Sequence, residues 1–137
     1  MKTTLALMLL CACAPLCAKA GDQAWTRVSG NSASELYIDQ RDIKDEDEGR
    51  KAWTLRSYRR PQTAPDGKTY RSVKAQYAYA CGERTATLLA QSYYPEAMGR
   101  GEAVGTFKYE QYDAEKILPG SVNESAFKRV CRKRPRR

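Results

Sequence analysis

The sequence predicts an α+β domain, an antiparallel β-sheet of about five to six strands with one C-terminal helix packed on a face, closed by one disulfide. Three observations lead to this class. Several segments alternate apolar and polar residues, as half-buried strands do. The pattern changes to helical spacing after Pro119-Gly120. Two cysteines, Cys81 and Cys131, remain when the first twenty residues are set aside.

The first expected strand spans residues 36–43, which contain several β-forming residues. The second spans residues 51–58, where Trp53 and Leu55 fall on one face of an alternating pattern. Residues 60–68 hold two prolines and an Asp-Gly pair, so we expect a loop there.

The clearest strand spans residues 71–81. One of its faces would carry Val73, Ala75, Tyr77, Tyr79 and Cys81. We expect a two-residue hairpin turn at Gly82-Glu83 and a return strand over 84–94, with Ala86, Leu88 and Ala90 on one face. A loop at 95–101 leads to the fifth expected strand, residues 104–112.

A short amphipathic helix is expected from Val122 to about Cys131. Ser121 and Glu124 have the spacing of a capping box. In this motif the serine hydroxyl accepts the backbone N–H of the glutamate, and the glutamate carboxylate accepts the backbone N–H of the serine. Because Cys81 ends the clearest strand, a disulfide to Cys131 would hold this helix across one face of the sheet.

The first twenty residues are typical of a signal peptide. Lys2 precedes an apolar run over residues 5–16, and Ala18-Lys19-Ala20 fits the site that signal peptidase cleaves, before Gly21. We therefore expect a signal peptide at 1–20, a folded domain at 21–131 and a basic C-terminal tail at 132–137. No later run approaches the roughly 18–20 apolar residues of a transmembrane helix.

A second processing route is open within this segment. Leu10-Cys11-Ala12-Cys13 resembles a lipobox, in which Cys13 would carry a lipid and become the new N-terminus. Cys11 is unusual at the second position of such a motif. Lipidation of Cys13 is therefore the alternative to cleavage before Gly21.

Export determines how the five cysteines are interpreted. Cys11, Cys13 and Cys17 belong to the first twenty residues, and in an oxidising compartment the two that remain are expected to pair. The bond would close a loop of about 50 residues, which stabilises the fold by roughly 4 kcal/mol. The alternative, a reactive thiol, lacks a neighbouring imidazolium or a Cys-x-x-Cys partner.

The chain has no histidine, which removes imidazole from nucleophile pairs and from metal sites. We expect no catalytic residues, no metal and no cofactor, and therefore a protein that is not an enzyme. The one dense acidic run comprises Asp42 and residues 45–48. It departs from the calcium-loop pattern, so we expect a solvated hairpin loop, with a weak cation site as the alternative.

The basic charge is concentrated at the C-terminus. The formal net charge of +8 falls to +6 without Lys2 and Lys19, and to −1 when the seven basic residues from Lys128 onward are also set aside. These residues are Lys128, Arg129, Arg132, Lys133, Arg134, Arg136 and Arg137. The body is thus close to neutral, and the tail is expected to attract an acidic partner.

In an exported protein, that partner would be lipopolysaccharide, anionic lipid, a sulfated glycan or an acidic host protein. The tail has no aromatic residue on which bases could stack, which argues against specific nucleic-acid binding. The alternative is a solubilising tail without a dedicated partner.

An ordered set of residues also spans the chain. It comprises Trp25, Tyr37-Ile38-Asp39 with Ile43, Trp53-Thr54-Leu55, Tyr58, Tyr70-Arg71-Ser72-Val73-Lys74, Tyr79-Ala80-Cys81, Tyr94 with Met98-Gly99 and Gly101, and Pro119-Gly120-Ser121 before Cys131. This set resembles the surface-adhesin protein E family of Gram-negative bacteria. The resemblance implies an antiparallel sheet with a helix packed on it, a disulfide and an envelope or surface location. It also implies binding to host matrix and serum proteins such as laminin and vitronectin.

Two functional hypotheses follow. The first is an adhesin-like binding module that contacts host matrix or serum proteins or acidic envelope components. The second is a periplasmic accessory protein, tethered electrostatically through its tail, with no host ligand. Both place the protein in the periplasm, at the outer membrane or cell surface, or in the medium, and both leave a homodimer open.

Overall fold

The computed structural model describes residues 24–108 and 113–133. Its first half contains β1 (Trp25–Gly30), β2 (Ser34–Asp39), the 3-10 turn η1 (Gln40–Asp42), β3 (Lys44–Glu46), β4 (Gly49–Thr63) and β5 (Thr69–Ala80). Its second half contains β6 (Thr85–Tyr94), the 3-10 turn η2 (Ala97–Gly99), β7 (Gly105–Lys108), β8 (Glu115–Lys116) and α1 (Val122–Val130). The predicted α+β class is confirmed, although the sheet has eight strands, more than expected.

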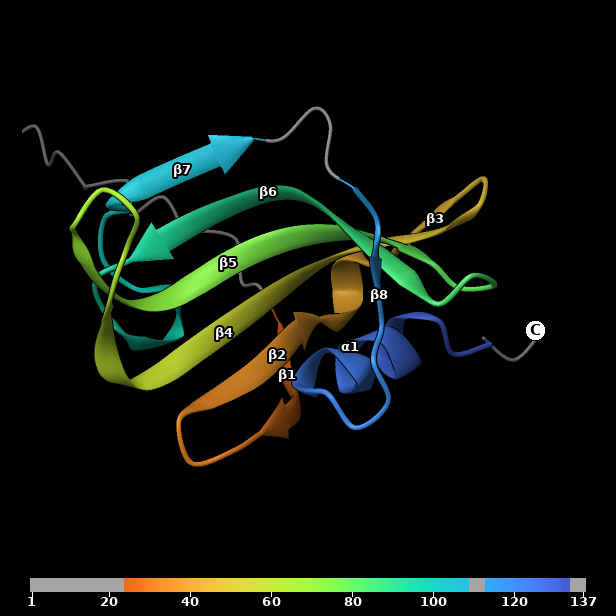
Figure 1. Ribbon diagram of the computed structural model, residues 1–137, viewed down its shortest axis with the longest axis horizontal. Helices are drawn as coiled ribbons and strands as arrows, with labels where there is room; N and C mark the ends of the chain where they lie inside the picture. The colour runs from red at the N-terminus through yellow and green to blue at the C-terminus, as the bar shows by residue number, and fades with distance from the viewer. Residues whose placement is uncertain (1–23, 109–112, 134–137) are drawn as a thin grey trace, which may run out of the picture.

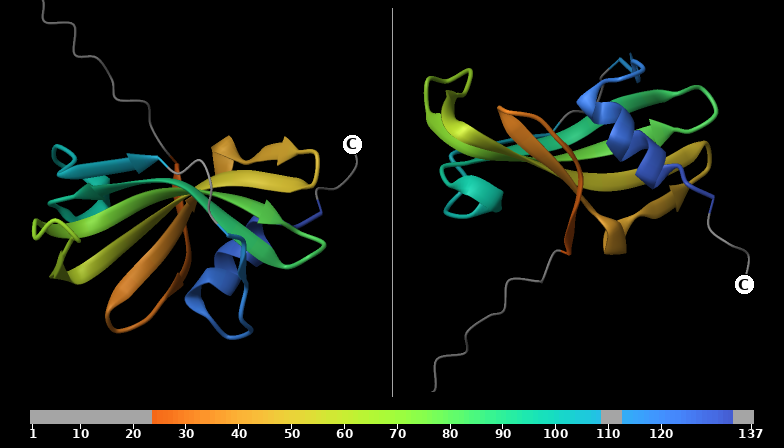
Figure 2. Two further views of the ribbon diagram at one scale, coloured as in Figure 1. Left: turned by 45° about the horizontal axis from the view of Figure 1, so that its top comes forward. Right: turned by 90° about the horizontal axis from the view of Figure 1, so that it is seen from below.

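The strands form one sheet in the order β1-β2-β4-β5-β6-β7, with β3 added to β4 and β8 added to β6. Every pairing is antiparallel. The sheet twists, and α1 lies across one of its faces (Figures 1 and 2). We call this the helix face, and the opposite face, which carries η2, the outer face.

The hydrophobic core lies between α1 and the helix face. It consists of Leu36, Ile38, Ala52, Tyr79, Ala86, Ile117, Ala126, Phe127 and Val130. Ile38 and Val130 are fully buried, and the rings of Tyr79 and Phe127 are 6.3 Å apart. Alternation in β2 and helical spacing in α1 therefore meet at one interface.

The predicted helix is confirmed as Val122–Val130, but its predicted capping box is not formed. Ser121 is the N-cap residue, yet its hydroxyl donates to the carbonyl of Leu118 (2.7 Å). Glu124 Oε2 instead accepts the N–H of Gly120 (2.9 Å). Gly120 has a positive φ of 78°, and the turn it forms places a different N–H within reach of the carboxylate.

Two strand boundaries differ from those expected. The strand expected over 36–43 ends at Asp39, because the Asp39 carboxylate accepts the N–H of Arg41 (3.1 Å) and starts η1. The loop expected over 60–68 is partly strand, since β4 continues to Thr63. A register shift between Ser57 and Gln62 accommodates Pro61, as bulges commonly do.

The expected two-residue turn at Gly82-Glu83 is wrong. Ala80 pairs with Thr85, so a four-residue loop connects β5 to β6. Its left-handed residue is Arg84 (φ 56°) rather than Gly82. Cys81 begins this loop and is bonded to Cys131, so it does not extend the ladder as the expected strand required.

Candidate functional site

A cavity of about 230 Å³ opens on the helix face beside α1. We call it the tyrosine groove, because its walls include Tyr58, Tyr70, Tyr77, Tyr79 and Tyr93. Arg56 and Gln91 line it from the strands, and Asn123 and Ala126 line it from α1. The groove is therefore built by the three central strands and one side of the helix.

Two strand irregularities bring tyrosines to this face. On β5, Val73, Ala75, Tyr77 and Tyr79 alternate regularly, and Tyr70 also lines the groove, beside the register shift of β4. On β6, Gln76 and Tyr77 of β5 face Ala90 and Leu88, which leaves Leu89 as an extra residue. Beyond this bulge, Tyr93 lies on the same face as Ala86.

These irregularities correct the expected face of β6. Ala86, Leu88 and Ala90 do not share one continuous face, because the bulge at Leu89 reverses the alternation between Leu88 and Ala90. Ala86 and Tyr93 are both buried despite their odd spacing. The same reversal makes Tyr93 a wall of the groove.

The aromatic rings form a ladder across four strands. Ring centroids are 5.9 Å apart for Tyr58 and Tyr70, 4.7 Å for Tyr70 and Tyr93, and 5.9 Å for Tyr93 and Phe107. All three contacts are edge-to-face, a geometry that contributes about 0.5–1.5 kcal/mol per pair. The groove runs between this ladder and α1, so both of its walls are fixed by packing.

The groove carries one positive charge. Arg56 is the one charged residue among the described residues that line it, and its guanidinium donates to Asn123 Oδ1 (2.9 Å). Burial raises the pKa of Tyr70, the neighbouring phenols Tyr58 and Tyr93 raise it further, and Arg56 lowers it. The Tyr70 phenol therefore stays neutral at physiological pH. Neutral hydroxyls, amides and one guanidinium make the groove suited to binding.

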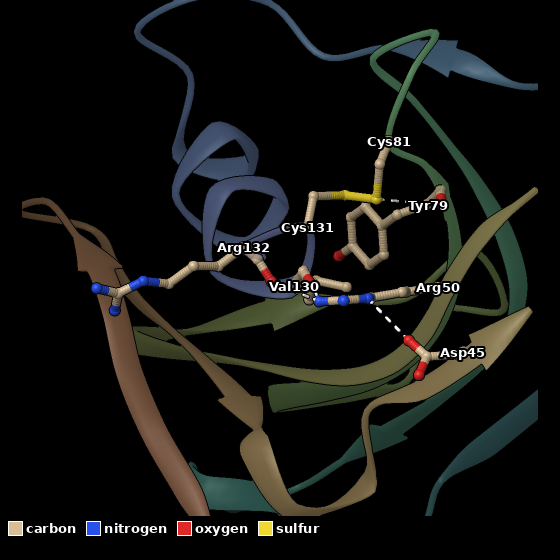
Figure 3. Close-up of a disulfide and its surroundings, with 7 residues drawn as sticks. All are labelled: Asp45, Arg50, Tyr79, Cys81, Val130, Cys131 and Arg132. Carbon is tan, nitrogen blue, oxygen red and sulfur yellow. Dashed lines mark hydrogen bonds and ion pairs between the residues drawn. A yellow bond between two sulfur atoms is a disulfide. The ribbon is translucent and has the colours of Figure 1, made fainter. Parts of the chain in front are cut away.

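The disulfide end of α1 is held at several points (Figure 3). Cys81 and Cys131 are joined with an S–S distance of 2.08 Å, which confirms the predicted pair. Arg50 Nη1 donates to the carbonyls of Val130 and Arg132, both at 2.7 Å, and its Nε lies 2.9 Å from Asp45. A cation at a helix C-terminus also interacts favourably with the helix dipole.

The comparisons with known proteins agree with this architecture. The sequence matches the family model of surface-adhesin protein E over residues 25–132. The chain belongs to the surface-adhesin protein E family. This confirms the resemblance noted from the residues between Trp25 and Cys131. No curated protein sequence matches the chain.

Solved structures of Haemophilus influenzae protein E have the same fold. One aligns with a TM-score of 0.57 and 18% identity, covering 78% of this chain and 83% of that chain. A second crystal form aligns with a TM-score of 0.54 and 16% identity, covering 76% and 91%. At this identity the likeness shows the shared fold.

The basic residues predicted to bind an acidic partner do not line the tyrosine groove. Lys128 Nζ lies 3.3 Å from Glu124, and Arg129 donates to Gln40 (3.2 Å). Arg132 and Lys133 are exposed. The rest of the predicted tail site, Arg134, Arg136 and Arg137, and the lipidation candidate Cys13 lie outside the described residues.

The acidic run is an exposed hairpin, as expected. Asp45 and Glu46 belong to β3, and they pair with Arg50 (2.9 Å) and Lys51 (2.8 Å) of β4. Within residues 24–108 and 113–133, no three acidic or cysteine side chains are placed to hold a metal ion. In that part of the chain no helix has the length and hydrophobicity to cross a membrane.

Sequence reasoning did not find the groove of this family member. Eight of the nine tyrosines fall in the expected strands, and Tyr70 falls just before the strand expected over 71–81. Regular alternation over 84–94 would put Tyr93 on the face opposite Ala86. A pattern of aromatic residues near the ends of three successive strands was the available signal. Only the positions of the bulges place these rings together.

Proposed function

We propose that this chain is an exported, non-enzymatic binding module of the adhesin type. Its tyrosine groove and the adjoining surface of α1 would contact a host matrix or serum protein or an acidic envelope component. The observation that carries the proposal is the groove itself, an open cavity of about 230 Å³ with aromatic walls on an adhesin E family fold. Tyrosine is enriched in recognition surfaces because it offers apolar area and a hydroxyl together.

Export belongs to the same proposal. We propose removal of residues 1–20 as a signal peptide and oxidation of the domain in the periplasm, with lipidation of Cys13 as the alternative anchor. The intramolecular disulfide between Cys81 and Cys131 supports an oxidising compartment. Family membership supports a location at the cell surface.

The second candidate function is an electrostatic tether. The observation that favours it is the concentration of basic residues beyond the middle of α1, on a body that is otherwise near neutral. Arg132 and Lys133 are exposed where the described chain ends. Such a segment attracts anionic surfaces with an affinity that falls as salt rises.

The deciding experiment compares the full chain, exported to the periplasm during expression, with a chain that ends at Lys133. This end point keeps the disulfide and the carbonyl of Arg132, which Arg50 binds. Both proteins are tested for binding to vitronectin, laminin, heparin and lipopolysaccharide over a salt series. We expect matrix-protein binding to survive the truncation and to vary little with salt.

The opposite result has a clear meaning. If binding disappears with residues 134–137 and with added salt, the chain is an electrostatic tether and the groove has no part in it. The adhesin proposal would be overturned by a full chain that binds none of the four probes and that is not cut when protease is added to intact cells. A shortened chain carrying Arg132→Gln and Lys133→Gln measures what these two described residues contribute.

A further inference from the structure

We propose that the tyrosine groove binds an acidic sugar residue of a glycan, with the sugar's anionic group on Arg56 and its ring against the tyrosine walls. This inference rests on the proposed function, because it names the ligand class of the same binding module. Three properties of the groove lead to it: its single charge, its size and the kind of polar groups it presents.

The charge of the groove calls for one anion. Arg56 is its one charged residue among those described, and its hydrogen-bond partner, Asn123, is neutral. Other basic residues of the fold form ion pairs with carboxylates, such as Arg50 with Asp45 and Lys51 with Glu46. A planar guanidinium without a carboxylate partner matches a carboxylate or a sulfate, which it can bind through two parallel hydrogen bonds.

The size of the groove fits one ring. Its volume of about 230 Å³ is below the roughly 300–1,000 Å³ of sites that take drug-sized molecules. The walls offer the rings of Tyr58, Tyr70 and Tyr77, which are only partly buried. Rigid aromatic surfaces suit the apolar faces of a pyranose ring, and the rest of a glycan chain would extend into solvent.

The polar groups of the groove match sugar hydroxyls. Among residues 24–108 and 113–133, the hydroxyls of Tyr58 and Tyr70 form no hydrogen bond with another residue. Neither hydroxyl oxygen is completely buried, so both can reach a ligand in the groove. A phenol can donate to one sugar hydroxyl and accept from another. Together with the Arg56 guanidinium, these two hydroxyls give the groove polar groups beside its aromatic walls.

A peptide fits the groove less well. Extended peptides are commonly captured by adding a strand to a free sheet edge, where backbone groups are unpaired. The floor is formed by β4, β5 and β6, whose backbone groups already pair with neighbouring strands on both sides. Recognition here depends on side chains alone, and a peptide would bring unpaired amides of its own.

The test measures binding of four soluble probes to the full chain by calorimetry. The probes are a hyaluronan hexasaccharide, which is carboxylated, a heparin hexasaccharide, which is sulfated, a neutral chitin hexasaccharide and a glutamate-rich peptide. The variants are Arg56→Gln and Tyr70→Phe. Arg60→Gln is the matched control, because Arg60 is exposed on the same strand and does not line the groove.

We expect at least one acidic hexasaccharide to bind, and the comparison of the two identifies the anion. Arg56→Gln should weaken that binding about tenfold, as loss of a charge-assisted hydrogen bond does. Tyr70→Phe should weaken it less, and Arg60→Gln should leave it unchanged. The neutral hexasaccharide should bind more weakly than the acidic ones.

Three results would overturn the proposal: no acidic hexasaccharide binds, Arg56→Gln and Arg60→Gln behave alike, or the peptide binds as well as the sugars. Failure here is separable from failure of the proposed function. If the sugars fail but vitronectin or laminin stripped of glycans still binds the full chain, the chain is an adhesin that recognises protein. If neither the sugars nor any of vitronectin, laminin, heparin and lipopolysaccharide binds, both proposals fall.

Discussion

At the residue scale, two serines fix a strained turn on the outer face. Ser57 and Ser72 are opposite each other on β4 and β5. The hydroxyl of Ser57 accepts the N–H of Met98 (3.2 Å), and that of Ser72 accepts the N–H of Gly99 (2.8 Å). Met98 and Gly99 both have positive φ, 60° and 67°. A non-glycine residue in this region is uncommon, and the paired serines hold it there.

Gly99 also packs closely against a lysine. A Cβ at this position would meet Cε of Lys74, so the lysine side chain would have to shift. The Lys74 ammonium lies 4.9 Å from the ring of Tyr94 and 5.9 Å from that of Trp25, and burial lowers its pKa. For the Met98-Gly99 pair that contributed to the family resemblance, the positive φ accounts for the glycine at position 99.

Tyr79 should make the protein sensitive to alkali. Burial raises the pKa of Tyr79, which is 4% exposed, far above its ordinary value. In the unfolded chain this phenol ionises near pH 10, so above about pH 10 the unfolded state holds fewer protons than the folded state. The free energy of unfolding is therefore unaffected by Tyr79 below the pKa that this phenol has in the unfolded chain, and it falls as the pH rises above that value.

The variant Tyr79→Phe tests this expectation. Its free energy of unfolding in urea should match that of the parent chain near neutral pH and should fall less steeply above about pH 10. A residual slope is expected, because the pKa values of Tyr37 and Tyr70 are raised as well. Parallel curves for the two proteins would show that Tyr79 does not control the alkaline transition.

Single residues differed in how far the sequence could predict them. The pair Cys81–Cys131 could be predicted, because the domain has only two cysteines and they allow one pairing. The roles of Tyr70 and Tyr93 could not, because Tyr70 lies opposite a register shift of β4 and Tyr93 follows the bulge of β6. A bulge depends on pairing between strands, and a pattern within one strand does not contain that information.

At the element scale, α1 depends on its attachments. It has nine residues, and isolated helices shorter than about 12–15 residues are marginal in water. Its stability comes from burying Ala126, Phe127 and Val130 against the sheet, from the disulfide and from the Arg50 contacts. The sequence predicted this element well because spacing, turn and cysteine position all agree there.

Removing the disulfide should destabilise the fold without abolishing it. The double variant Cys81→Ala, Cys131→Ala should lose about 2–5 kcal/mol of unfolding free energy, as measured by urea denaturation. The loop-closure value for a separation of 50 residues, roughly 4 kcal/mol, lies within this range. An unchanged midpoint would mean that the bond adds nothing to the other attachments of α1.

Strand boundaries were harder to predict than the helix. β3 has three exposed residues and β8 has two, so neither contains an apolar alternation from which it could be recognised. β4 continues past Pro61 because the register shift removes the need for an N–H there. Where the ladder is irregular, tertiary pairing rather than local propensity determines the boundary.

At the scale of the whole molecule, the two proposed binding features are separate. The groove meets α1 at Asn123 and Ala126, whereas the exposed basic residues Arg132 and Lys133 follow its C-terminal end. A short acidic glycan would occupy the groove alone. A long polyanion could contact both features, and its affinity would then exceed that of the short form through effective concentration.

Amide hydrogen exchange should divide the molecule along its sheet. β4 and β5 are the slowest elements expected, because each pairs with strands on both sides and contributes buried residues to the core. β7 pairs with β6 alone, three of its four residues are exposed, and β8 has two residues. Strands with few buried contacts open at low cost, so β7 and β8 should exchange fastest among the strands.

The same measurement on the disulfide-free double variant locates the effect of the bond. Exchange in α1 and in the loop at residues 81–84 should accelerate, because the bond joins these two segments directly. Exchange at the centre of β4 and β5 should accelerate only by the global loss of stability, and β7 should not change, because it opens locally. Uniform acceleration in every element would instead mean that α1 and the sheet open as one cooperative unit, so that the groove wall cannot move without unfolding of its floor.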